Sequence, residues 1–195
     1  MDMDRNMRRG KFVVFEGLDG AGCSTQAKLF YDYLQRHGHP AILTGEPYEK
    51  GESARKIKEV LWGQRKVTPR YLQQLFVQNR KEHLKHEVEP ALWQQMTVIC
   101  DRYFYSGIAF GSIDLDPEWL MQVNAKFPEP DATFIIAVPP EKCMERIDAS
   151  GKAKEIFEKV SKLRKAWKTY QMLPERFPRV YIINGEGTIA ETHRH

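Results

Sequence analysis

Short apolar runs alternate with longer amphipathic stretches along the whole chain. Five runs have the length and composition of buried strands: residues 11–16, 41–44, 97–100, 133–138 and 179–183. Apolar residues at helical spacing predict helices over residues 26–37, 71–84, 117–125, 140–147 and 155–170. Asp116 is placed to cap the helix that opens at Pro117. This alternation predicts an α/β fold, in which five parallel strands form a sheet flanked by helices.

Length and composition are those of one globular domain, which we expect to span residues 1–195. Hydrophobic residues make up 42% of the chain and charged residues 29%, and no apolar run approaches the ~20 residues that cross a bilayer. The first ten residues lack the apolar core of a secretory signal. We therefore expect a cytoplasmic protein that does not associate with membranes.

The charge and the cysteine content of the chain exclude few classes of function. The net charge is +4, and residues 141–179 hold eleven Lys and Arg against six Asp and Glu. This stretch is typical of a solvated helix face; without an array of stacking aromatics, it does not favour nucleic acid as a partner. Cys100 and Cys143 show no metal-site spacing and are expected to be buried thiols.

A glycine-rich segment follows the first predicted strand. It reads Gly17-Leu18-Asp19-Gly20-Ala21-Gly22-Cys23-Ser24-Thr25 and matches the phosphate-binding P-loop pattern except that Cys23 replaces the lysine. The strand before it and the helix after it are the context that this motif requires; an ordinary glycine-rich βα turn is the alternative. Backbone N–H groups would face phosphate, and Ser24 would hold Mg²⁺. The fold expected is thus a three-layer α/β fold of the P-loop NTPase type.

Further polar residues follow the predicted strands at their carboxyl ends, where ligands bind in parallel sheets. Asp101 ends the third strand and suits Mg²⁺, directly or through water. Arg102 beside it suits a phosphate, although a structural Asp–Arg pair would show the same sequence.

Five motifs in this order resemble the thymidylate kinase family. They are Phe15-Glu16-Gly17-Leu18-Asp19-Gly20-Ala21-Gly22-Cys23-Ser24-Thr25-Gln26, Thr44-Gly45-Glu46-Pro47, Leu75-Phe76-Val77-Gln78-Asn79-Arg80, Asp101-Arg102-Tyr103-Phe104-Tyr105-Ser106, and Pro130-Asp131-Ala132-Thr133 with Val138-Pro139-Pro140-Glu141. The resemblance runs nearly from end to end. It implies phosphoryl transfer from ATP to dTMP, with Mg²⁺ as cofactor, nucleotides as partners and a homodimeric assembly.

The resemblance also implies roles for individual residues. The ATP-binding set is Gly17, Gly20, Ala21, Gly22, Cys23, Ser24, Thr25 and Arg146, the last of which resembles the residue that lies over adenine. The dTMP-binding set is Asp19, Glu46, Pro47, Phe76, Arg80, Arg102, Ser106, Gly107 and Phe110. Within it, Phe76 would stack on thymine, Arg80 would donate to O4, and Phe110 would pack against deoxyribose. Ser24, Asp101 and Glu16 are the expected magnesium set.

The chain departs from the family pattern at the reaction centre. Cys23 replaces the P-loop lysine, Gly45 replaces an arginine that contacts the acceptor phosphate, and Gly20 leaves no arginine in the loop. A lid is expected around residues 148–154, and Lys152 and Lys154 there are candidate catalytic cations alongside Asp19 and Arg102. Three alternatives stay open: a non-catalytic nucleotide-binding homologue, a kinase for another nucleoside monophosphate, and a nucleic-acid-binding protein.

Overall fold

A single five-stranded sheet forms the centre of the protein. The computed structural model describes residues 10–151 and 155–194. All neighbouring strands are parallel, in the order β2-β3-β1-β4-β5. The strands are β1 (Phe12–Gly17), β2 (Ala41–Gly45), β3 (Thr97–Asp101), β4 (Ala132–Ala137) and β5 (Val180–Asn184). Each was expected from its apolar run, and no strand end differs from the expectation by more than one residue.

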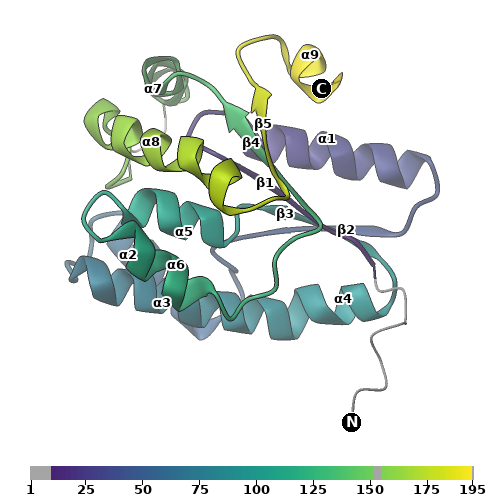
Figure 1. Ribbon diagram of the computed structural model, residues 1–195, viewed down its shortest axis with the longest axis horizontal. Helices are drawn as coiled ribbons and strands as arrows, with labels where there is room; N and C mark the ends of the chain where they lie inside the picture. The colour runs from purple at the N-terminus through teal and green to yellow at the C-terminus, as the bar shows by residue number, and fades with distance from the viewer. Residues whose placement is uncertain (1–9, 152–154, 195) are drawn as a thin grey trace.

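Helices cover both faces of this sheet, which gives the three-layer arrangement expected (Figure 1). In the described residues they are α1 (Cys23–Arg36), α2 (Glu52–Leu61), α3 (Pro69–His83), the π-helix η1 (Leu84–Val88), α4 (Glu89–Trp93), α5 (Phe104–Gly111), α6 (Pro117–Asn124), α7 (Pro140–Ala149), α8 (Val160–Arg176) and α9 (Ile189–Arg194). Helix α1 packs on β1, β2 and β3 from one side, whereas α3, α4 and α5 lie on the other (Figure 1).

Some helix expectations were incomplete or wrong. The helix expected over residues 155–170 begins only at Val160 and continues past Pro174 to Arg176. Helices α2, α4, α5 and α9 were not expected at all. The cap at Asp116 is confirmed, because its carboxylate accepts hydrogen bonds from the backbone N–H groups of Glu118 and Trp119.

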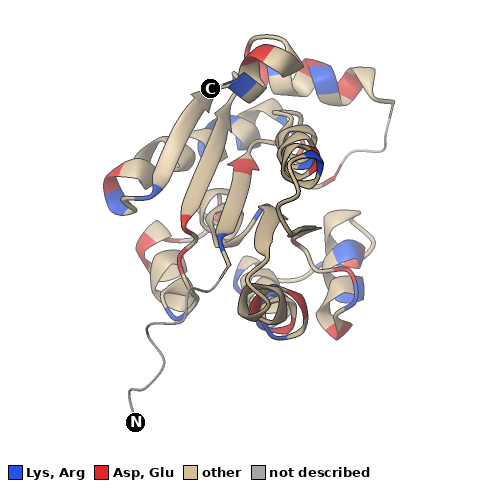
Figure 2. Ribbon diagram, turned by 90° about the vertical axis from the view of Figure 1, so that its right-hand side faces the viewer, with Lys and Arg blue, Asp and Glu red and all other residues tan. Residues whose placement is uncertain are grey.

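The core lies between the central strands and the helices that cover them. Val14, Ile99 and Ile135, one on each of β1, β3 and β4, are fully buried. Charged residues gather on the helices and at strand ends, whereas most of the sheet carries none (Figure 2). Cys100 and Cys143 are buried free thiols, as expected, and burial raises the pKa of Cys143 to about 12. No helix within residues 10–151 and 155–194 is long and apolar enough to cross a membrane.

The sheet brings the carboxyl ends of three strands together. Gly45 pairs with Asp101 at the ends of β2 and β3, and Phe15 pairs with Asp101 across β1 and β3. The segments that follow these strands therefore meet at one edge, where the candidate site lies.

Candidate active site

The P-loop joins β1 to α1 and has the backbone that its glycines allow. Gly20 and Gly22 have φ angles of 82° and 101°, in the left-handed region that residues with a Cβ rarely adopt. Gly22 is the N-cap of α1, and no side chain caps the first turn of the helix. The backbone N–H groups of that turn are thus available to an anion, together with the positive end of the helix dipole.

Cys23 lies inside this loop. Its side chain is buried, and its Sγ lies 2.9 Å from where a Cβ on Gly17 would stand. Burial raises the pKa of the thiol, and the positive charge of Arg102 opposes that rise without reversing it. Cys23 is therefore a neutral thiol, which adds no cation to the loop and no negative charge against a phosphate.

Ser24 and Asp101 form the polar pair next to the loop. The Ser24 hydroxyl donates to Asp101 Oδ2 at 2.5 Å. The other carboxylate oxygen, Oδ1, is buried and has no hydrogen-bond partner among the described residues. A hydroxyl beside an unpartnered carboxylate oxygen is a donor set that fits Mg²⁺, which takes few protein ligands and completes its shell with water and phosphate.

Glu16 has a different place from the one expected. Its side chain is fully buried, and its oxygens accept hydrogen bonds from Tyr103 N (2.8 Å), Ser106 N (3.2 Å), Ser106 Oγ (2.5 Å) and Tyr170 Oη (2.8 Å). Burial raises the pKa of this carboxyl, while Arg102 and the hydrogen bonds oppose the rise. The expectation that Glu16 helps to order Mg²⁺ finds no support in this geometry; the carboxylate instead fixes the turn after β3.

That turn presents Arg102 to the P-loop. Arg102 has a φ of 70°, an unusual conformation for a residue with a side chain, and its backbone N–H donates to Phe15 O. Its guanidinium donates to Gly17 O (2.8 Å), Ser106 Oγ (3.1 Å) and Asp19 Oδ1 (2.7 Å). The structure thus brings Asp19 and Arg102, two of the candidate catalytic residues, together at the mouth of the loop.

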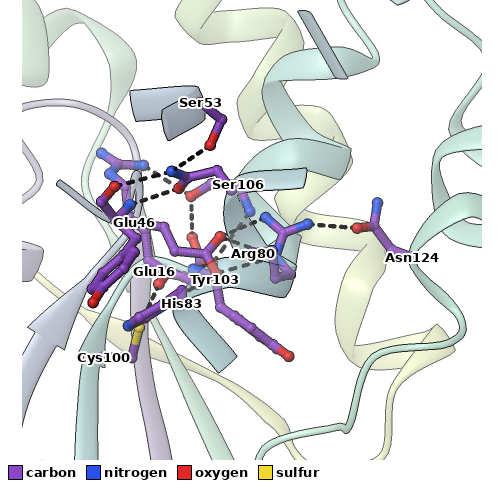
Figure 3. A network of polar contacts seen from close by, with 12 residues as sticks. Glu16, Glu46, Ser53, Arg80, His83, Cys100, Tyr103, Ser106 and Asn124 are labelled. Atoms are coloured by element: carbon purple, nitrogen blue, oxygen red, sulfur yellow. Dashed lines mark hydrogen bonds and ion pairs between the residues drawn. The ribbon is translucent and has the colours of Figure 1, made fainter. Parts of the chain in front are cut away.

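A second polar cluster lies farther from the P-loop, where the segment that follows β2 meets α3. Arg80 on α3 is 2% exposed, and its guanidinium donates to Glu46 Oε2 at 2.6 Å and to Asn124 Oδ1 at 2.5 Å. His83 Nδ1 lies 3.3 Å from Glu46 Oε1. Figure 3 shows Arg80 held between Glu46 and Asn124. The cluster fixes the Arg80 guanidinium at one end of a cavity.

This cavity has a volume of about 790 Å³ and connects the two clusters. The expected site residues that line it are Asp19, Ser24, Glu46, Pro47, Phe76, Arg80, Asp101, Arg102, Ser106, Gly107 and Phe110. The other described residues of the expected set do not line it: Glu16, Gly17, Gly20, Ala21, Gly22, Cys23, Thr25 and Arg146. Lys152 and Lys154 lie outside the described residues. The cavity therefore unites the expected acceptor site with the expected P-loop mouth.

Arg146 lies behind the P-loop, on α7. Its guanidinium donates to Gly20 O at 3.2 Å, Ala21 O at 3.4 Å and Gly185 O at 3.4 Å. It therefore touches the loop that would hold the phosphates, which is compatible with the expected place beside the donor nucleotide.

Comparison with known proteins agrees with this geometry. The family model described as thymidylate kinase matches residues 15–195. The chain is 38% identical over 191 residues to a probable thymidylate kinase of Pyrococcus horikoshii, covering 95% of this chain and 93% of the relative. It is 34% identical over 171 residues to a thymidylate kinase of Plasmodium falciparum, covering 87% and 80%.

The chain belongs to the thymidylate kinase family. A solved structure of a thymidylate kinase from Candida albicans has the same fold, with a TM-score of 0.82 at 24% identity over 95% of this chain and 88% of that one. The P-loop NTPase-type fold expected from the sequence is confirmed.

Set within the thymidylate kinase family, two departures have local explanations. A Cβ at Gly45 would stand 2.9 Å from the backbone oxygen of Asp101, so the close pairing of β2 and β3 favours glycine there. Cys23 fills the space under Gly17 and leaves the P-loop without its lysine, while Arg102 reaches the same loop from the end of β3.

Several residues that line or build the site were not expected from the sequence. Tyr170 on α8 reaches Glu16 from 154 residues away, and Asn124 on α6 reaches Arg80. No local sequence signal marks such long-range contacts. Gln73 also lines the cavity. Its spacing of three and seven residues from Phe76 and Arg80 along a helix could have placed it on the same face.

Proposed function

We propose that this protein transfers the γ-phosphoryl group of ATP to dTMP, forming dTDP and ADP. The observation that carries the proposal is one continuous cavity that runs from Asp19 and Ser24 at the P-loop to Phe76 and Arg80 at its other end. A phosphotransferase must hold donor and acceptor in line, and catalysis of this reaction depends mostly on such positioning and on charge.

The acceptor end of the cavity fits a pyrimidine nucleotide. Phe76 offers an aromatic face on which thymine can stack, and Arg80 offers a guanidinium donor for the O4 carbonyl. The ring centre of Phe110 lies 5.5 Å from Cζ of the Arg102 guanidinium. This is where the sugar would join the base to the phosphate. In this arrangement the acceptor phosphate meets Arg102, next to Asp19.

Ser24 and Asp101 would hold Mg²⁺ at the donor end. When bound, the ion would neutralise charge on the transferring phosphates. The hydroxyl of Ser24 and the unpartnered Oδ1 of Asp101 are the groups available to it. The first turn of α1 supplies N–H groups to the phosphates, and Arg146 packs against the outside of the loop.

Arg102 is our candidate for the charge that Cys23 does not provide. Its guanidinium donates to Gly17 O in the P-loop, and burial raises the pKa of the Cys23 thiol while the positive charge of Arg102 opposes that rise. An arginine in that position can contact the acceptor phosphate with one edge and the transferring phosphoryl group with another. Lys152 and Lys154 stay predicted contributors from the expected lid.

The homodimer also stays a proposal. We propose helices α3 and α6 as its contact surfaces, since Tyr71 on α3 is a large side chain that is 41% exposed. Sedimentation tests the dimer. The cytoplasmic location and the absence of a nucleic-acid partner are likewise predictions, which cell fractionation and oligonucleotide titration test in turn.

An acceptor panel tests the proposed function. The protein is incubated with ATP, Mg²⁺ and dTMP, dUMP, dCMP or AMP, and each diphosphate product is quantified. The proposal expects the highest kcat/KM with dTMP, and Arg102→Met lowers it by about 10²–10³-fold, as loss of a preorganised charge contact does. Arg164→Met, which removes an exposed cation on α8, is the matched control and leaves the rate unchanged.

The panel also separates the alternatives. A preference for dUMP or dCMP would identify a kinase for another nucleoside monophosphate. Tight dTMP binding without product would identify a non-catalytic homologue. Steeply salt-dependent binding to oligonucleotides, without any nucleotide kinase activity, would identify a nucleic-acid-binding protein.

A further inference from the structure

Gln73 is a buried polar residue that faces the acceptor end of the cavity. It lies on α3, is 4% exposed and lines the cavity beside Phe76 and Arg80. Among residues 10–151 and 155–194 its side-chain amide makes no hydrogen bond, and its polar atoms are not among the fully buried atoms that lack a partner. The amide therefore opens onto the cavity, where it is free to bond a ligand.

Two glycines on α5 make room for this amide. Oε1 of Gln73 lies 3.4 Å from where a Cβ on Gly107 would stand, and Nε2 lies 3.0 Å from the equivalent point on Gly111. Nη2 of Arg80 lies 3.8 Å from the same point on Gly107. The amide oxygen of Gln73 and the guanidinium of Arg80 therefore converge on one spot of the cavity wall, where Gly107 has no side chain.

The three residues on α3 have different chemical capacities. Phe76 offers an aromatic face, Arg80 can only donate hydrogen bonds, and Gln73 can both donate and accept. Their spacing, at positions i, i+3 and i+7, places them on one helical stripe. The imide edge of thymine and uracil presents an N3–H donor between two carbonyl acceptors. Such an edge can give its N3–H to an amide oxygen while a carbonyl accepts from the guanidinium.

We propose that Gln73 determines base specificity, accepting the N3–H of the acceptor base through Oε1 while Arg80 donates to the adjacent carbonyl. The proposal rests on the proposed function and names the group that reads N3 at that site. It assigns the site to pyrimidines with an imide edge. Cytosine presents an amino group in place of the O4 carbonyl. Its amino group and the Arg80 guanidinium are both hydrogen-bond donors and could not bond each other, so cytosine is disfavoured.

A purely structural role is the competing explanation. In that case the amide fills the space between α3 and α5, and its replacement would weaken every acceptor equally. Chemical modification of the base separates the two roles, because N3-methyl-dTMP lacks the N3–H donor but keeps the ring, the sugar and the phosphate.

The test measures binding of dTMP and of N3-methyl-dTMP by calorimetry, which requires no phosphoryl transfer. The variants are Gln73→Leu, of similar size, and Gln73→Asn, which keeps the amide but shortens its reach. Gln74→Leu, the exposed neighbouring glutamine, is the matched control. Thermal unfolding of each variant confirms that it is folded.

We expect wild type to bind dTMP about tenfold more tightly than N3-methyl-dTMP, the size of one net hydrogen bond. Gln73→Leu should remove most of that preference by weakening dTMP alone, Gln73→Asn should remove part of it, and Gln74→Leu should keep it. Equal weakening of both ligands, or no change in Gln73→Leu, would overturn the inference while dTMP binding upheld the proposed function. Failure of wild type to bind dTMP at all would overturn both.

Discussion

The buried ion pair between Glu46 and Arg80 should be the most sensitive point of the acceptor site. Their side chains are 4% and 2% exposed, and Glu46 accepts from both Nε and Nη2 of Arg80. Glu46→Gln keeps the shape of the side chain but removes the charge that pairs with the Arg80 guanidinium, which keeps its hydrogen bond to Asn124 and its contacts with the rings of Tyr103 and Phe127. Removing one charge of a buried pair costs about 3–5 kcal/mol. Because glutamine still offers one carbonyl oxygen, we expect about 3 kcal/mol.

Urea unfolding, monitored by circular dichroism, measures this loss in the free energy of unfolding. For a domain of this length, about 3 kcal/mol corresponds to a fall in Tm of roughly 6–12 °C. The double variant Glu46→Gln, Arg80→Met removes both charges and should recover more than half of the loss, because a buried pair replaced by neutral groups is often nearly as stable.

An exposed pair gives the control. Lys58 and Glu49 lie 3.0 Å apart with side chains 52% and 78% exposed, so Glu49→Gln should change stability by no more than about 0.5 kcal/mol. A loss below about 1 kcal/mol in Glu46→Gln, or a double variant less stable than the single one, would show that the buried charges of Glu46 and Arg80 do not depend on each other.

Three further predictions concern Cys23, Asp101 and Glu16. Cys23→Lys should raise kcat by less than about tenfold, because Arg102 already places charge at the loop; a rise of 10²–10³-fold would show that the natural site is uncompensated. Asp101→Asn should raise the Mg²⁺ concentration needed for half-maximal rate without changing dTMP affinity in a calorimetric titration; equal Mg²⁺ dependence would remove Asp101 from the metal site. Burial raises the pKa of Glu16 above its ordinary 4.5, so the folded state holds the proton more tightly than the unfolded state. The free energy of unfolding of wild type, relative to that of Glu16→Gln, should therefore fall as the pH rises from 4.5 through the pKa of the folded state. Urea titrations at several pH values measure this difference. A relative stability that rises over that range would show that the pKa of Glu16 is not raised.

The sheet and the P-loop could be predicted from sequence because their signals are local. Each strand is a short apolar run, and the loop is set by glycines whose positions follow from backbone geometry, as the φ angles of Gly20 and Gly22 show. Helix α5 was missed because Gly107 and Gly111 lower its helix propensity, and its apolar residues are buried in the α3–α5–α8 packing.

The composition of the site was predictable only in part. Residues within a motif, such as Asp101 and Arg102, lie where the strand ends place them. The role of Glu16 depended on Tyr170, whose hydroxyl arrives from α8, and the setting of Arg80 depended on Asn124 from α6. Such contacts follow from tertiary packing and have no signature in the local sequence.

Direct detection of dTDP tests the central claim. Wild-type protein with Cys23 in place is incubated with dTMP, ATP and Mg²⁺, and dTDP and ADP are separated and quantified. We expect the two to appear in equal amounts, dTDP formation to require Mg²⁺, and Arg102→Met to abolish most of it. The absence of dTDP from wild type, together with its appearance in Cys23→Lys, would show instead that Arg102 does not replace the missing lysine.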